Sequence, residues 1–215
     1  MKIIYTPHLT QGRARRTSSL SRLNSGREET ADALPPGHRH MSVKVIVVSG
    51  SMGSGKTTVL GEASDILSAR GVVHAAIDLD AMGSALLPDA VSCDVTYRNL
   101  AAVWANYAAV GVNRLLLAEA VENRDMLDRL RRAIPGAELI VCRLLADPKT
   151  MQQRIRLREP GMLQQQFLAR VMELQKVLDR AGLEDFAITN ENVLVTDVAR
   201  ELLERAGWLA DSISQ

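Results

Sequence analysis

Short apolar runs alternate with longer amphipathic segments from residue 43 to residue 207. Five of the runs predict buried β-strands, because they are short and rich in β-branched and aliphatic residues. They are residues 43–49, 72–80, 113–120, 137–145 and 186–190. Between the runs, apolar residues recur at helical spacing; Val59, Ala63 and Leu67, for example, would share one face of a helix that stops before a glycine.

Start and stop signals mark the other predicted helices. Asp94, Asp147 and Thr196 are residue types that commonly cap a helix N-terminus, and a proline follows Asp147 at the first helical position. The predicted helices are residues 57–70, 94–110, 123–133, 147–159, 162–182 and 196–207, with a short one around 82–87. Alternation of strand and helix predicts an α/β fold, in which a five-stranded parallel sheet is covered on both faces and ligands bind at the carboxyl ends of the strands.

The first 42 residues differ in composition from the rest of the chain. They are rich in Ser, Arg, Gly and Pro and lack sustained apolar periodicity, so they cannot bury enough surface to offset the entropy of ordering. We predict a disordered extension over residues 1–42 and one folded domain over residues 43–215. Met41 directly precedes the first strand, so an upstream start-site artefact and a basic recruitment tail are alternatives.

Composition narrows the range of partners. A net charge of +1 gives no field that would attract nucleic acid or an anionic membrane, and 3% aromatic residues offer few base-stacking platforms. No apolar stretch approaches the ~20 residues of a membrane span. Cys93 and Cys142 lack metal-type spacing and are predicted to be small core residues in a cytoplasmic protein. The oligomeric state stays open, a homodimer included.

A glycine-rich loop follows the first predicted strand and precedes the first predicted helix. It matches the pattern G-x-x-x-x-G-K-[ST] and predicts a phosphate-binding loop. The candidate nucleotide-binding residues are Gly50, Ser51, Met52, Gly53, Ser54, Gly55, Lys56, Thr57 and Thr58. Glycines allow backbone N–H groups to converge on a phosphate, and the helix adds its positive end. Lys56 would reach the outer phosphates, and the Thr57 hydroxyl would bind Mg²⁺.

Acidic residues end the next two predicted strands. Asp78 and Asp80 are two residues apart and would face the same side of an extended strand, toward the loop. One of them could hold magnesium and the other could accept the proton of an attacking hydroxyl; a pair of solvated acids is the alternative. The third strand ends in Glu119, with Glu122 just beyond it; either could support magnesium or a water, or both could simply begin the next helix.

The stretch "VIVVSGSMGSGKTT", followed by "IDLDAMGSALLP", resembles the small-molecule kinases of the P-loop class. The nearest resemblance is to adenylylsulfate kinase, with the acidic pattern of shikimate kinases also similar, and it covers about residues 43–207. It implies a three-layer P-loop NTPase fold with a helical lid, and ATP and Mg²⁺ as cofactors. Leu79 stands where adenylylsulfate kinases carry glycine, so the acceptor is not fixed by the resemblance.

The same resemblance implies roles for individual residues. Asp78 would join Thr57 in the magnesium shell, and Asp80 would bind or deprotonate the acceptor. Arg98 and Arg124 match acceptor-binding positions. Arg154 and Arg158 match the lid over the nucleotide, with Lys56, Asp80 and Arg154 as the catalytic set. Because Arg154 and Arg158 are four residues apart, they would share a helix face beside the hinge at residues 160–161; a solvated basic face is the alternative.

Three functions fit these features. The first is an ATP-dependent kinase that phosphorylates a hydroxyl of a metabolite, nucleoside or nucleotide. The second is an ATPase or switch that lacks transfer chemistry, and the third is a polynucleotide 5′-kinase, which the near-neutral charge disfavours. A guanine-specific N-K-x-D motif is not found; the segment "TNEN" at residues 189–192 lacks its lysine and is expected near the adenine instead. The expected partners are a nucleotide and a small-molecule acceptor.

Overall fold

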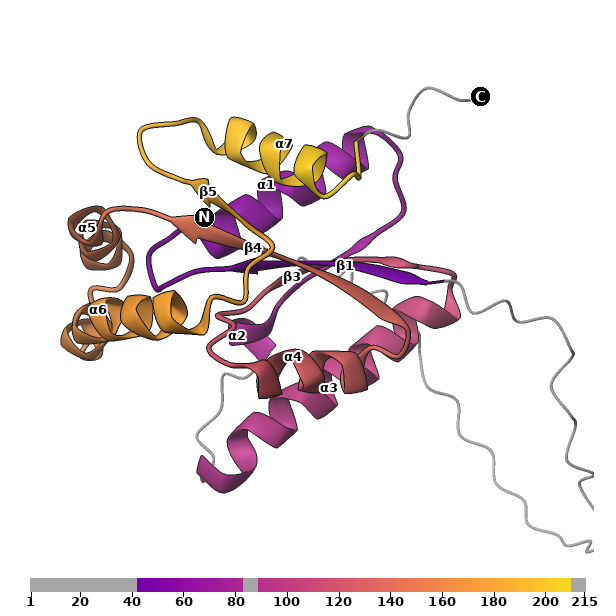
Figure 1. Ribbon diagram of the computed structural model, residues 1–215, viewed down its shortest axis with the longest axis horizontal. Helices are drawn as coiled ribbons and strands as arrows, with labels where there is room; N and C mark the ends of the chain where they lie inside the picture. The colour runs from indigo at the N-terminus through magenta and orange to yellow at the C-terminus, as the bar shows by residue number, and fades with distance from the viewer. Residues whose placement is uncertain (1–41, 83–88, 210–215) are drawn as a thin grey trace, which may run out of the picture. The chain divides into compact units, whose positions relative to one another are not determined.

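The computed structural model describes residues 42–82 and 89–209 (Figure 1). The predictions of a disordered extension and of a short helix around residues 82–87 therefore fall outside the described residues, apart from Ser42 and Met82 at their edges. The side chain of Cys93 also lies outside them. No helix of the described part is both long and apolar enough to cross a lipid bilayer.

Five parallel strands form one sheet in the order β2-β3-β1-β4-β5. Their bounds are β1 Val43–Ser49, β2 Ala75–Asp78, β3 Arg114–Ala118, β4 Ala137–Leu145 and β5 Phe186–Thr189. The central strand β1 lies between β3 and β4, with Val45 opposite Leu115 on one side and Leu139 on the other. The predicted α/β class with a five-stranded parallel sheet is confirmed.

Helices cover both faces of the sheet (Figure 1). In the described residues they are α1 Lys56–Ala69, α2 Leu79–Met82, α3 Asp89–Ala109, α4 Arg124–Ala133, α5 Pro148–Arg158, α6 Gln164–Ala181 and α7 Val195–Arg205. Figure 1 shows α1 and α7 on one face, and α3 and α4 on the other. The pair α5 and α6, here called the lid segment, lies beyond the carboxyl ends of the strands.

Alternation along β1 builds two apolar cores, one on each face. Val45 and Val47 point to the core beneath α3 and α4, which also holds Trp104. Ile46 and Val48 point to the core beneath α1 and α7. Both sets are almost fully buried, which explains why this strand reads as an unbroken apolar run rather than an alternating one. The loop therefore leaves a strand that is buried on both faces.

Three boundary predictions were wrong. The second strand ends at Asp78, because Leu79 is buried as the first residue of the short helix α2. Asp94 does not cap its helix, because α3 already begins at Asp89. Thr196 is the second residue of α7, and its hydroxyl donates to Glu62 of α1 (2.6 Å) instead of capping. The cap predicted at Asp147 is confirmed, since its carboxylate accepts from the Lys149 N–H (2.8 Å).

Candidate active site

The loop between β1 and α1 encloses a small cavity of about 50 Å³. Helix α1 begins at Lys56, so its first N–H groups have no partners within the helix and lie at this cavity. Such free donors and the positive end of a helix favour a bound phosphate. The cavity is lined by Met52, Gly53, Gly55, Lys56, Thr57, Asp80 and Arg158. Of the other predicted loop residues, Gly50, Ser51, Ser54 and Thr58 do not line it.

Gly53 and Gly55 of the loop are required by packing as well as by backbone conformation. A Cβ atom at Gly53 would lie 2.5 Å from the carbonyl oxygen of Met151 in α5. One at Gly55 would lie 2.3 Å from the Asn190 Nδ2 atom. Both glycines have positive φ values, +78° and +100°, which other residues rarely adopt. The glycines therefore let the lid segment and the strand β5 end approach the loop, a reason additional to phosphate access.

The Lys56 side chain is held over the loop by a backbone carbonyl group of the loop. Its side chain is buried, and its Nζ atom donates to the Gly50 carbonyl oxygen at 3.2 Å. A carboxylate oxygen of Asp80 lies 4.0 Å away, and this Asp80 side chain is 68% exposed. The ammonium group thus lies at the small cavity and has only weak contacts with its present partners. It could therefore replace these contacts with a stronger one to a bound phosphate.

Asp78 and Thr57 bring two oxygen groups together. The Thr57 hydroxyl donates to Asp78 Oδ2 at 2.6 Å, and the other carboxylate oxygen accepts from the Asp80 N–H at 3.1 Å. Hydroxyl and carboxylate oxygens are ligands that Mg²⁺ prefers. No group of three His, Cys, Asp or Glu in the described residues could hold a metal alone. A Mg²⁺ that arrives with phosphates needs only one or two protein oxygens, so these residues fit it.

A larger cavity of about 390 Å³ adjoins the loop. Its lining comes from the loop, from α2, from the segment after β3 and from the lid segment: Met52, Lys56, Asp80, Glu119, Ala120, Glu122, Arg158, Glu159, Phe167, Arg170 and Leu174. Met52, Lys56, Asp80 and Arg158 line the small cavity as well. A phosphate in the small cavity would therefore face whatever occupies the larger one.

The segment after β3 is anchored to the central strand. The N–H of Glu119 donates to the Val48 carbonyl oxygen (3.2 Å), and the N–H of Val121 donates to the Ser49 hydroxyl (3.1 Å). These bonds fix Glu119 at the wall of the larger cavity. The pKa of Glu119 is raised to about 8, chiefly by burial and also by the nearby Asp80 charge, while the Lys56 ammonium partly opposes this rise. Glu119 is thus mainly protonated at neutral pH.

The two lid arginines have different surroundings. The Arg154 guanidinium donates to the backbone carbonyl oxygens of Gly53 (3.2 Å) and Asn190 (2.8 Å), so it clamps the loop to the end of β5. Arg158 is 62% exposed, pairs with neighbouring Glu159 (2.9 Å), and lines both cavities. Arg154 therefore holds the loop in position, while the Arg158 side chain lies where it could contact a ligand in either cavity.

Further contacts fasten the lid segment to the loop. The Ser51 hydroxyl donates to the Val171 carbonyl oxygen in α6 at 3.0 Å. Met52 packs against the apolar cluster shared by α5 and α6, which includes Met151 and Val171. Displacing the loop would therefore disturb the wall of the larger cavity.

Asn190 makes contacts with the loop and with the lid segment that sequence reasoning missed. Its side-chain amide donates to the Ser54 carbonyl oxygen at 2.7 Å, and its backbone carbonyl accepts from Arg154. The neighbouring Glu191 accepts from the Asp147 N–H (3.1 Å) and from the Thr150 hydroxyl, at the start of α5. The "TNEN" segment, which was expected near an adenine, thus joins the loop to the lid segment. In the sequence, the two consecutive polar residues at the end of a strand were the feature that could have indicated these contacts.

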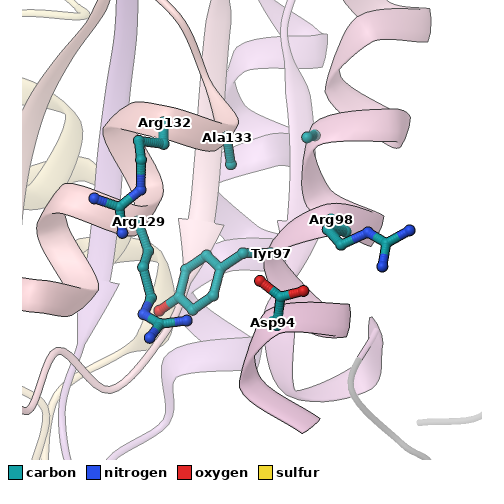
Figure 2. Close-up of a pocket in the computed structure, with 7 residues that line it drawn as sticks. Asp94, Tyr97, Arg98, Arg129, Arg132 and Ala133 are labelled. Carbon is teal, nitrogen blue, oxygen red and sulfur yellow. The ribbon is translucent and has the colours of Figure 1, made fainter. Parts of the chain in front are cut away.

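The expected acceptor arginines lie elsewhere. Arg98 lines a separate cavity of about 190 Å³ between α3 and α4 (Figure 2). Asp94 and Tyr97 of α3 line the same cavity, and Figure 2 shows the Arg129 side chain extending from α4 to the Tyr97 ring. Arg124, the first residue of α4, is exposed. Neither Arg98 nor Arg124 lines the cavities at the loop, so this geometry gives no support to their expected contact with an acceptor there.

Two solved structures with a similar fold are kinases. No family model and no curated protein matches the sequence. A gluconokinase from Sinorhizobium meliloti 1021 is similar over 79% of this chain and 95% of its own, with 23% identity and a TM-score of 0.53. A shikimate kinase from Acinetobacter baumannii, in complex with shikimate, is similar over 81% and 97%, with 18% identity and a TM-score of 0.52.

A third similar structure is the tunicamycin resistance protein of Deinococcus radiodurans. It covers 77% of this chain and 96% of its own, with 16% identity and a TM-score of 0.54. At these identities the likeness establishes the fold alone. The chain has a P-loop small-molecule kinase-like fold, which confirms the resemblance identified from the loop and the acidic pair.

Proposed function

We propose that the protein is an ATP-dependent phosphotransferase that moves the γ-phosphoryl group of Mg·ATP to a hydroxyl group of a small molecule. The observation that carries this proposal is the junction of the two cavities. Lys56, Asp80 and Arg158 line both the small phosphate-sized cavity and the larger one. A donor phosphate and an acceptor would therefore meet beside a carboxylate and two cations.

In the proposed reaction, the acceptor hydroxyl oxygen forms a bond to the γ-phosphorus. The bond from that phosphorus to the β–γ bridging oxygen breaks, and its electron pair leaves with ADP. The hydroxyl proton passes to the exposed carboxylate of Asp80, which acts as general base. Lys56 and Arg158 would stabilise the charge that develops on the phosphoryl oxygens.

The remaining residues hold the donor in place. Thr57 and Asp78 would hold Mg²⁺, which neutralises phosphate charge when bound. Arg154 would keep the loop in its binding conformation through Gly53 and Asn190, acting on the reaction only indirectly. The kinase fold of the solved neighbours is consistent with this assignment.

The test measures Mg·ATP binding by calorimetry and ADP release with a panel of hydroxyl-bearing acceptors. Lys56→Ala should weaken Mg·ATP binding and abolish turnover. Lys44→Ala is the matched control, because Lys44 is an exposed lysine near the other end of β1. A wild-type protein that binds no Mg·ATP would overturn the proposal. Slow ADP release that no acceptor accelerates would instead indicate an ATPase.

A further inference from the structure

The larger cavity carries more carboxyl groups than cations. Its described lining contains four carboxyl groups, from Asp80, Glu119, Glu122 and Glu159, and three cationic groups, from Lys56, Arg158 and Arg170. Under the proposed function, Lys56 and Arg158 face the phosphates, because they also line the small cavity. Arg170 is then the one lining cation of the described residues left to meet an acceptor.

Arg170 already has two anionic partners. Its Nη2 atom lies 3.0 Å from both carboxylate oxygens of Glu122, and its Nη1 atom lies 3.0 Å from Glu173. Both contacts are charge-assisted hydrogen bonds, which are roughly twice as strong as hydrogen bonds between neutral groups. An acceptor acid group that bound Arg170 would have to displace Glu122 or lie beside its carboxylate, and either arrangement brings two negative charges close together.

We infer that the acceptor is a polyol or amino alcohol that carries no carboxylate or phosphate group, and that Glu122 enforces this choice by occupying Arg170. The inference rests on the proposed function, since it treats the larger cavity as the acceptor site. Hydroxyl or ammonium groups of such an acceptor would donate to the carboxylates of Asp80 and Glu122. Arg98 and Arg124, which could have met an acid, do not line this cavity.

The test compares three probes with one six-carbon skeleton: D-glucitol, D-gluconate and D-glucosamine. Their dissociation constants are measured by NMR titration of the protein saturated with Mg²⁺ and a non-hydrolysable ATP analogue. The wild type should bind gluconate more weakly than the other two probes. Glu122→Gln should bind gluconate at least about tenfold more tightly than the wild type, the size expected for one charge-assisted hydrogen bond.

Two further variants assign the effect to the Glu122–Arg170 pair. Glu173→Gln is the matched control: Glu173 also pairs with Arg170, but it is 67% exposed and does not line the cavity, so gluconate affinity should not change. Adding Arg170→Gln to Glu122→Gln should remove the gain. Thermal melts check that each variant is folded.

Two results would overturn the inference: a wild type that prefers gluconate to glucitol, or a folded Glu122→Gln variant with no gain for gluconate. Because the titration needs nucleotide binding but not turnover, its outcome is separate from whether phosphoryl transfer occurs. Failure of every acceptor to accelerate ADP release would count against the kinase reaction while leaving charge selection by Glu122 in place.

Discussion

The backbone N–H of Asp80 donates to the Oδ1 atom of Asp78 at 3.1 Å, although the two residues belong to different elements. Asp78 ends β2, and its second carboxylate oxygen accepts from Thr57. Asp80 lies in the first turn of α2, where its side chain is largely exposed near Lys56. The two carboxylates thus reach the same site with different partners, and their functions should separate on mutation.

Asp78→Asn should raise the Mg²⁺ concentration needed for ATP binding by about 10–100-fold, because it weakens an oxygen ligand beside Thr57. Asp80→Asn should leave ATP binding unchanged but lower the transfer rate by about 10²–10⁴-fold, because a general base is lost. Calorimetric ATP titrations at several Mg²⁺ concentrations, combined with ADP release, separate the two effects. If both variants lower ATP affinity alike, the division of roles is wrong.

Loop glycines should differ in how much stability they contribute. Gly53→Ala should lower the free energy of unfolding by at least about 2 kcal/mol, since a Cβ there combines positive φ with contact to a backbone carbonyl. Gly55→Ala should cost less, about 1–2 kcal/mol, because the Asn190 amide it meets can move.

Gly61→Ala is the matched control for these substitutions. Gly61 lies inside α1, has no atom within 4 Å of its built Cβ, and is exposed. Its replacement should stabilise the protein by up to about 1 kcal/mol, the helix-propensity difference. Urea unfolding at one pH measures all three variants, and an equal cost for Gly53→Ala and Gly61→Ala would contradict the packing argument.

Arg154 and Arg158 should respond differently to replacement by alanine. Arg154→Ala should lower the free energy of unfolding by about 2 kcal/mol and weaken ATP binding, because the carbonyls of Gly53 and Asn190 lose their donor. Arg158→Ala should leave unfolding within about 0.5 kcal/mol of the wild type, since its side chain is largely exposed.

The kinetic readout completes this comparison. Arg158→Ala should reduce kcat about 10²-fold with little effect on stability, as for the loss of a group that stabilises transition-state charge. A stability loss on Arg158→Ala with normal kcat would reverse the two assignments.

Sequence pattern was sufficient for the parts of the fold set by local rules. The apolar run of β1, the glycine loop and the cap at Asp147 are each determined by residues that are neighbours in the chain. The lid contacts were not accessible in this way. The bond from Ser51 to Val171 joins residues 120 positions apart, and that from Asn190 to Ser54 joins residues 136 apart.

The acidic pair shows how a prediction can reach the right place by the wrong geometry. Strand periodicity placed Asp78 and Asp80 on one face, but burial of Leu79 starts a helix between them, and the turn of that helix brings Asp80 toward Lys56. The contacts of the arginines were the hardest to predict, because a long flexible side chain can reach more than one cavity. Arg98 and Arg154 differ in partners for reasons of packing that spacing does not encode.

Glu119 should make stability depend on pH. Its pKa is raised from 4.5 to about 8 in the folded protein, chiefly by burial, so the folded state binds an extra proton between these values. The free energy of unfolding should therefore fall as pH rises from about 4.5 to about 8 and level off above that. The change should stay below ~5 kcal/mol, because 1.36 kcal/mol corresponds to one pKa unit and the pKa rises from 4.5 to about 8.

Two variants test the origin of this slope in urea unfolding with EDTA and without nucleotide. Glu119→Gln replaces the titrating carboxyl group with an amide. In this variant the free energy of unfolding should no longer show the decrease between pH 4.5 and 8 that Glu119 causes. Asp80→Asn removes a negative charge that raises the Glu119 pKa, so the pH at which stability levels off should move below 8. A slope that persists unchanged in Glu119→Gln would assign the pH dependence to other groups and would leave Glu119 ionised at the cavity wall.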